Sequence, residues 1–207
     1  MYQVYGMPRT RSTRVVWALE ELGADYQLHL VDLTKGEGQS PEFLKLNPAG
    51  KVPVLTDGEL VLTESAAICT YLGDRHPESG LVPRPGTAER AEYDQWGYFV
   101  LSELEQPLWT LGKHRFALPK ERRVAAILDV APWEFQRAAK VLATRLDQRN
   151  YLVGDSFSMV DILAAHPLLW ARAFKVPHGF ASLDAYEQRI CAREAFARAR
   201  ERENTAN

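Results

Sequence analysis

Apolar residues in the first third of the chain recur at two different spacings. Residues 2–6 form a short run typical of a strand, and residues 26–31 alternate apolar and polar side chains as a half-exposed strand does. Between them, the apolar residues from 12 to 22 recur at helical spacing and stop at Gly23. The pattern predicts a strand, a helix and a second strand.

The same alternation continues beyond these elements. Residues 41–46 (PEFLKL) predict a short helix after a polar stretch. Two apolar runs meet at Asp57-Gly58, a dipeptide that favours the tight turn of a hairpin. Residues 63–75 (TESAAICTYLGDR) predict a further helix, so residues 1–76 are expected to form an α/β domain of order β-α-β-α-β-β-α.

Proline and glycine mark a boundary after this domain. Residues 77–86 (PESGLVPRPG) hold three prolines and two glycines, which is typical of a linker. Beyond them the pattern is helical throughout, so residues 87–207 are expected to form an all-helical domain. The expected helices span about 87–113, 119–148 with Pro132 as a kink or break, 158–173 with Pro167 inside, 180–191 and 194–202.

Composition and charge narrow the classes of function. The 207 residues are 46% hydrophobic and 25% charged, which suits a compact chain with a full-sized core. A net charge of -2 and a pI near 6.2 argue against a nucleic-acid partner, which requires a basic face. The apolar runs are far shorter than the roughly 18 residues of a membrane span, and the N-terminus resembles a strand rather than a signal peptide.

The two cysteines, Cys69 and Cys191, lie far apart and belong to no CxxC motif or Cys/His cluster. They are interpreted as reduced core thiols in a reducing compartment. The histidines also lack the spacing of metal ligands. The sequence therefore predicts a cytoplasmic protein without a metal site and without a membrane partner.

Residues 47–55 (NPAGKVPVL) place a proline inside an apparent strand, although proline cannot donate to a sheet ladder. One interpretation is a cis bond between Val52 and Pro53. That bond would turn the backbone and leave the polar groups of Val52 open to pair with an extended peptide. The alternative is an edge strand with a trans bond, which is the commoner form before proline.

Glu64 and Ser65 stand where a predicted strand gives way to a helix. A helix N-terminus offers free N–H groups and partial positive charge, which suit a carboxylate. Ser65 could hold a carboxylate and Glu64 an ammonium group beside it, so that the pair would bind an amino-acid head group. The alternative is simple capping of the helix.

Residues 8–14 (PRTRSTR) form the loop into the first helix and mix hydroxyl groups with arginines. A nearby positive charge lowers a thiol's pKa and favours the reactive thiolate. The loop could therefore stabilise a bound thiolate. The alternative is a helix cap by Thr10 or Ser12 with solvated arginines.

Residues 154–162 (GDSFSMVDI) predict a helix start with a structural purpose. Ser158 and Asp161 have the spacing of a capping box, with Asp in place of the usual Glu, and Phe157 and Ile162 have the spacing of a hydrophobic staple. We assign this segment to folding of the helical domain.

These segments, in this order, resemble the glutathione transferase superfamily. The specific matches are NPAGKVPVL, TESAAICTYL and GDSFSMVDI, and RVVWALEELGADY is similar to the family's first helix and second strand. The resemblance covers nearly the whole chain. It implies a thioredoxin-like N-terminal domain, an all-helical C-terminal domain, glutathione as co-substrate and a homodimer with its active site between the two domains.

The resemblance also implies roles for individual residues. Val52, with Pro53 cis, is expected to bind the cysteinyl backbone of glutathione, and Glu64 and Ser65 its γ-glutamyl end. Positive charge near the peptide is expected from Arg11, Lys35 and Lys51. The electrophile is expected against the helix at 87–113, and most of the apolar candidates there can equally be core residues. The candidates are Trp96, Tyr98, Phe99, Ser102 and Glu105.

The chain departs from the family where many members carry a catalytic Ser, Cys or Tyr, because Arg9 falls on the usual Ser or Cys position. The hydroxyl candidates are, in order, Thr10, Tyr5 and Ser12. The resemblance thus implies a glutathione transferase acting in detoxification, in which glutathione thiolate attacks a hydrophobic electrophile. Alternatives are a glutathione-dependent disulfide-bond oxidoreductase and a non-catalytic glutathione-binding scaffold.

Overall fold

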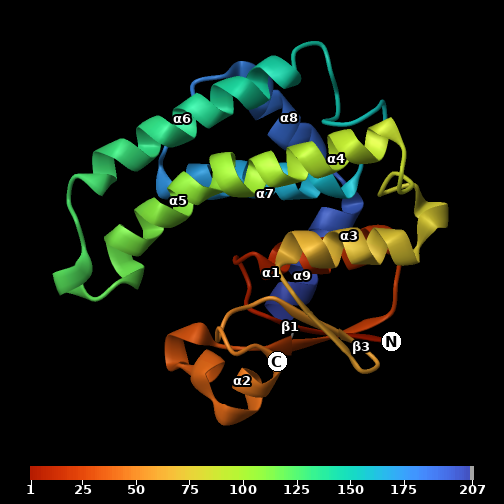
Figure 1. Cartoon of the computed structure of the whole chain (residues 1–207), viewed down its shortest axis with the longest axis vertical. Coiled ribbons are helices and arrows are strands. Elements are labelled where there is room, and N and C mark those ends of the chain that lie inside the picture. Colours follow the sequence, from red (N-terminus) through yellow and green to blue (C-terminus); the bar gives the residue numbers. More distant parts are fainter. Residues whose placement is uncertain (206–207) are drawn as a thin grey trace. The chain divides into compact units, whose positions relative to one another are not determined.

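The computed structural model describes residues 1–205, which form two compact units (Figure 1). The first unit comprises Met1–Val82 and the chain from Cys191 onward, and the second comprises Pro83–Ile190. The first is α/β and the second is all-helical, so the expected fold class is confirmed.

A four-stranded mixed sheet organises the first unit, in the order β2-β1-β3-β4. β1 runs parallel to β2, and this pairing requires a crossover, which the helix α1 supplies. β3 and β4 form the expected antiparallel hairpin. The strands are β1 (Tyr2–Gly6), β2 (Tyr26–Leu30), β3 (Val54–Asp57) and β4 (Leu60–Thr63).

Helices cover both faces of this sheet (Figure 1). α1 (Ser12–Leu22) packs against α3 (Ser65–Arg75), and both contribute fully buried apolar residues. The short helix α2 (Pro41–Leu46) packs through Phe43 against Val54 of β3. Since successive side chains alternate across a strand, Val54 and the buried Leu55 point to opposite faces.

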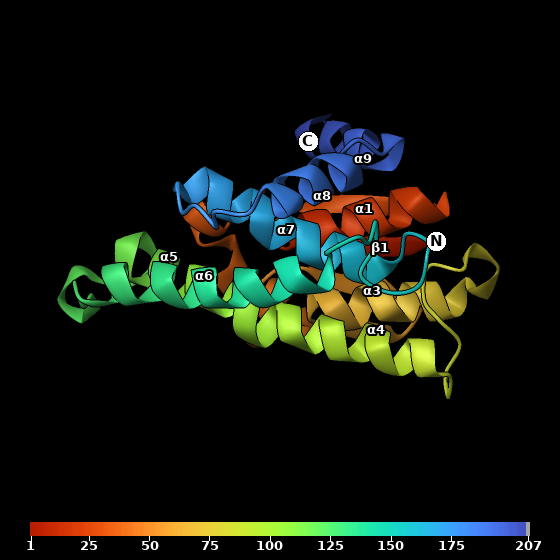
Figure 2. The same ribbon diagram turned by 90° about the horizontal axis from the view of Figure 1, so that it is seen from above.

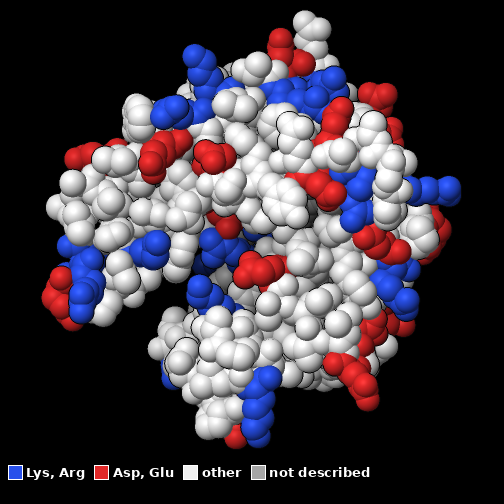
Figure 3. Space-filling view, viewed as in Figure 1, with Lys and Arg blue, Asp and Glu red and all other residues white. Residues whose placement is uncertain are grey.

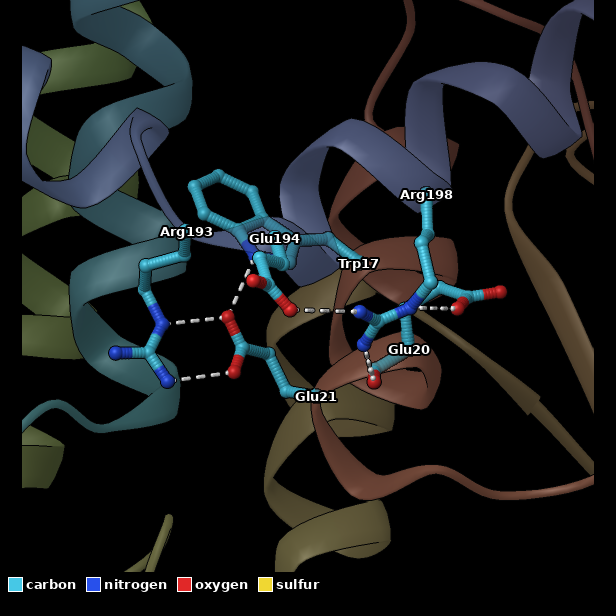
Figure 4. A network of polar contacts seen from close by, with 6 residues as sticks. All are labelled: Trp17, Glu20, Glu21, Arg193, Glu194 and Arg198. Carbon is cyan, nitrogen blue, oxygen red and sulfur yellow. Dashed lines mark hydrogen bonds and ion pairs between the residues drawn. The ribbon is translucent and has the colours of Figure 1, made fainter.

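The last helix, α9 (Glu194–Thr205), packs along α1 in the first unit. Figure 4 shows the polar part of this contact: Arg193 donates to both carboxylate oxygens of Glu21 at 2.6 and 2.7 Å, and Arg198 pairs with Glu20 at 3.0 Å. The sequence assigned this helix to the helical domain of residues 87–207. The difference arises because its partners lie some 170 residues earlier, beyond the reach of local spacing.

The second unit consists of α4 to α8 (Figure 2). The expected helix at 87–113 is present, but a π-helical turn at Val100–Leu104 divides it. α6 begins at Ile127 rather than near 119: Lys120–Arg122 form a 3-10 turn instead, and the Arg123 side chain donates to the carbonyls at the end of the preceding helical segment at 2.8 to 3.0 Å. The helices are α4 (Ala88–Phe99), α5 (Glu105–Gly112), α6 (Ile127–Arg145), α7 (Met159–Phe174) and α8 (Ala181–Cys191).

The predicted capping box stands at the start of α7. The Ser158 N–H donates to the Asp161 carboxylate at 2.9 Å. The same carboxylate, which is fully buried, accepts from the Leu152 N–H at 3.0 Å and from the Tyr186 hydroxyl at 2.7 Å. One side chain therefore joins the helix start to the preceding loop and to α8.

Charged side chains of both signs share the surface of the molecule (Figure 3). On the face shown in Figure 3, acidic and basic side chains are interspersed. Within residues 1–205, no helix combines the length and apolar character that crossing a bilayer requires.

Candidate functional site

A tight turn before β3 presents the backbone of Val52. The Asn47 amide donates to the Lys51 carbonyl at 2.6 Å and accepts from the Ala49 N–H at 3.0 Å. Gly50 has a φ of 63°, and a Cβ there would meet the Gly38 carbonyl at 2.8 Å, so only glycine fits. These contacts fix the course of the chain into Val52.

The Val52–Pro53 bond is cis, as one interpretation of the sequence required. Within residues 1–205, the N–H and carbonyl of Val52 form no hydrogen bond, because the β1–β3 ladder starts at Val54. The side chain of Val52 packs on the apolar cluster of Val31, Phe43 and Val54. The backbone of Val52 is therefore held in place with both polar groups available to an extended peptide.

Glu64 and Ser65 stand at the start of α3. Glu64 is exposed and has a φ of 66°, an unfavourable conformation for a residue with a side chain. Ser65 is the first residue of the helix, so its N–H has no acceptor within the helix. The strained residue turns the chain so that the free N–H groups of α3 begin immediately after β4.

Arg14 lies beside this helix start and is 0% exposed. Its Nη1 donates to the Ser65 hydroxyl at 3.1 Å. The partial positive charge of the helix N-terminus and the guanidinium group together favour a bound carboxylate. From the sequence, the loop arginines were expected either to stabilise a bound thiolate or to be solvated, and a buried contact with Ser65 was not foreseen. The burial of Arg14 could have been inferred from its position on the apolar face of α1, four residues before Ala18.

The loop between β1 and α1 holds the hydroxyl candidates. The Thr10 hydroxyl donates to the Met7 carbonyl at 2.7 Å and lies 3.0 Å from the Ser12 oxygen. Ser12 is buried and accepts from the Met7 N–H at 3.2 Å, while Thr10 is half-buried. Ser12 thus stabilises the loop from within, and Thr10 is the more accessible hydroxyl.

The strand ends place these segments at one edge of the sheet. Tyr5 of β1 pairs with Val54 of β3, which pairs in turn with Thr63 of β4. The chain leaves β1 just after Tyr5, enters β3 just before Val54 and leaves β4 just after Thr63. The loop 7–12, the turn 47–53 and the N-terminus of α3 therefore lie side by side.

Comparison with known proteins agrees with this geometry. The family model described as the glutathione S-transferase N-terminal domain matches residues 1–74, and the model of the C-terminal domain matches residues 109–194. Glutathione S-transferase 3 of Zea mays is 33% identical over 180 residues, covering 81% of this chain and 76% of the maize protein. The chain belongs to the glutathione transferase superfamily.

Other members of the superfamily are similar over nearly the full length. The disulfide-bond oxidoreductase YfcG of Escherichia coli is 31% identical over 208 residues, covering 96% of this chain and 94% of its own. The structure of a glutathione transferase from Methylococcus capsulatus has a TM-score of 0.89 at 31% identity, with 99% of each chain covered. The transferase URE2P6 of Phanerochaete chrysosporium, solved with oxidised glutathione, has a TM-score of 0.87 at 27% identity over 100% of this chain and 97% of its own.

The other residues expected near glutathione are more peripheral. Lys35 is exposed and pairs with Asp32 at 3.3 Å, and Lys51 is exposed beside Val52. Arg11 is half-buried and directly precedes α1. The loop that carries Lys35 approaches the turn, since Gly38 lies against the Gly50 carbonyl. Both lysines thus lie on segments near Val52.

Tyr5, the second hydroxyl candidate, is part of the apolar packing of the first unit. Its ring stacks on His29 with centroids 4.8 Å apart and meets Phe43 edge-on at 6.5 Å. It also packs on the cluster beneath Val52. These contacts give Tyr5 a supporting position under the peptide site.

The residues expected to bind the electrophile do not form a single surface of the helical unit. Trp96 and Glu105 are buried, and Trp96 packs edge-on against the half-buried Phe99 at 5.3 Å. Tyr98 is 72% exposed, and its carbonyl accepts from the exposed Ser102 hydroxyl at 2.9 Å. Of the five, Tyr98 and Ser102 are the accessible ones.

The buried cysteine offers no protein nucleophile. Burial raises the pKa of the Cys69 thiol to about 12, against the lowering effect of Arg14. The thiol is therefore protonated at neutral pH, and a thiolate reaction at this site requires the sulfur of a bound ligand.

Proposed function

We propose that the protein is a glutathione S-transferase that binds glutathione along Val52 and promotes attack of its thiolate on a hydrophobic electrophile. The observation that carries the proposal is the shared sheet edge. There the open backbone of Val52, the amide groups of α3 with Arg14 behind them, and the hydroxyl loop lie together. A γ-linked tripeptide needs a backbone partner, a carboxylate site and a sulfur site, and this edge offers all three.

In this proposal the tripeptide lies extended, with its cysteinyl N–H and carbonyl paired to Val52. Its γ-glutamyl carboxylate binds the Ser65 N–H and hydroxyl, and Glu64 takes the ammonium group. Lys35, Lys51 and Arg11 contribute positive charge around the peptide. The thiol loses its proton to solvent, the sulfur forms a bond to the electrophilic carbon, and the leaving group departs with its electron pair.

The Thr10 hydroxyl is the proposed donor to the thiolate. A free thiol with a pKa of about 8.5 is only a few per cent ionised at neutral pH. A hydrogen bond to the ionised form lowers that pKa. Thr10 now donates to the Met7 carbonyl at 2.7 Å, so rotation of its hydroxyl would be needed to reach the sulfur.

Replacing Thr10 with valine tests this assignment. We expect kcat/KM for conjugation of a model electrophile to fall roughly 30-fold, because a hydrogen bond to a charged group contributes about 2 kcal/mol. The pKa governing kcat/KM should rise by about 1.5 units for the same reason. Thr10→Ser keeps the hydroxyl and should stay close to wild type, whereas equal losses in both variants would exclude the hydroxyl as donor.

A second candidate activity is glutathione-dependent disulfide reduction. It is favoured by the similarity to the Escherichia coli oxidoreductase over 96% of this chain. Neither cysteine lies in the loop 7–12, so glutathione is the proposed sulfur source in this reaction as well. Rates of conjugation of a model electrophile and of reduction of a small disulfide, measured side by side, separate the two. Reduction alone would replace the transferase proposal.

The proposal also covers the location, the role and the oligomeric state of the protein. We place the protein in the cytoplasm as a detoxifying homodimer, with the accessible Tyr98 and Ser102 nearest the electrophile. Leu60 and Val61 are exposed on the edge strand β4, an apolar surface that a second subunit would cover. A molar mass of one chain by sedimentation would exclude the homodimer.

A further inference from the structure

α9 brings a buried carboxylate to the loop that carries Thr10. Glu203 is 3% exposed, and its Oε1 accepts from the Thr13 hydroxyl at 2.6 Å. The backbone N–H of Arg9 also donates to this carboxylate. On the other side, Arg200 of α9 donates to Oε2 at 3.0 Å. Glu203 thus holds the loop on both sides of Thr10.

Contacts other than this carboxylate also hold α9 against α1. The ion pairs of Arg193 and Arg198 with Glu21 and Glu20 lie at the opposite end of α1 (Figure 4). These two ion pairs hold α9 at a partly solvated position, because the arginine side chain of each pair is at least one-third exposed. Burying a carboxylate at the other end is costly unless its donors are well placed. Burial accordingly raises the pKa of Glu203, against the hydrogen bonds from Thr13 and Arg9.

The contact with Arg9 fixes an unfavourable backbone conformation. Arg9 has a φ of 62°, which a residue with a side chain adopts only when its surroundings hold it there. Thr10 is the next residue, so the placement of its side chain depends on the Arg9 backbone, while the Met7 carbonyl and the Ser12 N–H contact its hydroxyl directly. Thr13 ties the first turn of α1 to the same carboxylate.

We infer that Glu203 is a positioning residue that holds the loop 9–13 so that the Thr10 side chain lies within reach of the sulfur of bound glutathione. The inference rests on the proposed function, in which Thr10 donates to the thiolate. It extends the site to the last helix of the chain, about 190 residues beyond the loop that it orients. Arg200 is the basic group beside the Glu203 carboxylate, and the negative charge of Glu203 contributes to the raised pKa of Tyr26 in β2.

Charge and position predict opposite effects when Glu203 is removed. A carboxylate near a thiolate disfavours ionisation, so loss of its charge alone would lower the thiol's pKa. Loss of the Thr10 hydrogen bond would instead raise that pKa. The sign of the change therefore distinguishes a positioning role from a purely electrostatic one.

The test is an ultraviolet titration of the glutathione thiolate in the binary complex, without any electrophile. Glu203→Ala should raise the midpoint by about one pH unit, a tenfold fall in the ionisation constant of the thiol. Glu203→Gln keeps one acceptor and should give a smaller rise. Thr13→Val removes one loop contact without changing the charge and should shift the midpoint in the same direction.

Two controls separate positioning from a loss of structure. Arg198→Ala weakens the α1–α9 contact at its other end and should lower thermal stability without moving the midpoint. In a Thr10→Val background, Glu203→Ala should no longer raise the midpoint, because the two residues act through one hydrogen bond.

Two outcomes would overturn the inference. In the first, the wild type lowers the thiol's pKa, but the midpoint is unchanged or lowered in Glu203→Ala and Thr13→Val. This result rejects the role of Glu203 and leaves the transferase proposal intact. A wild type whose bound thiol titrates like free glutathione rejects both.

Discussion

Replacing Ser65 with alanine is expected to weaken glutathione binding roughly 100-fold, since a hydrogen bond to a charged group contributes about 1.5–3 kcal/mol. The variant loses the hydroxyl proposed to bind the γ-glutamyl carboxylate. It also removes the oxygen that accepts from the Arg14 guanidinium at 3.1 Å. Titration calorimetry with glutathione measures the effect directly.

A helix cap in the other unit supplies the control for Ser65. The Thr87 hydroxyl accepts from the Arg90 N–H at 3.1 Å at the start of α4. Thr87→Ala should lower the free energy of unfolding by about 1 kcal/mol and leave glutathione affinity unchanged. Wild-type affinity in Ser65→Ala would remove Ser65 from the peptide site, whatever its effect on stability.

Asp161→Asn is expected to lower the free energy of unfolding by about 3 kcal/mol, because buried donors that lose an acceptor cost about 1–3 kcal/mol each. One carboxylate oxygen accepts from the Ser158 N–H and hydroxyl, and the other from Leu152 and Tyr186. The asparagine amide has one accepting oxygen, so its NH₂ group would face the donors that now bind the second carboxylate oxygen. Urea denaturation measures the loss.

The effect of Asp161 should also depend on pH. Burial raises the pKa of its carboxyl, against the hydrogen bonds that lower it. The folded state therefore favours the neutral form more than the unfolded state does. The contribution of Asp161 to stability rises as pH falls from the folded pKa to the unfolded value of about 3.9. The difference between wild type and Asp161→Asn should widen over that range.

An exposed aspartate nearby controls for the change from carboxylate to amide. Asp155 lies in the loop before α7 and is exposed, so Asp155→Asn should change the free energy of unfolding by less than about 0.5 kcal/mol. Equal losses in the two variants would contradict the account of Asp161 as a buried acceptor. Unchanged stability in Asp161→Asn would contradict it as well.

Local spacing predicted most of the fold. The alternation of strands and helices in residues 1–76 depends on side-chain periods of 2 and 3.6, which neighbouring residues determine. The capping box at Ser158 was predictable because its partners are three residues apart. The start of α6 at Ile127 was not, since residues 120–122 form a 3-10 turn and the Arg123 side chain binds carbonyls five to eight residues earlier, contacts that apolar spacing does not indicate.

The candidate site was predictable where it is built from contiguous residues. The segments around Val52 and Ser65 carry the resemblance to the family, and the structure brings both to one sheet edge. Arg14 and Glu203 were missed because their roles depend on contacts across 51 and 190 residues. Sequence spacing indicates which face a residue occupies and does not indicate which distant side chain meets it.

A crystal structure of the protein soaked with glutathione tests the central claim most directly. The account predicts the cysteinyl N–H and carbonyl paired with the backbone of Val52, the γ-glutamyl carboxylate at the Ser65 amide and hydroxyl, and the sulfur beside Thr10. Glutathione bound elsewhere, or absent from this edge at saturating concentration, would contradict it.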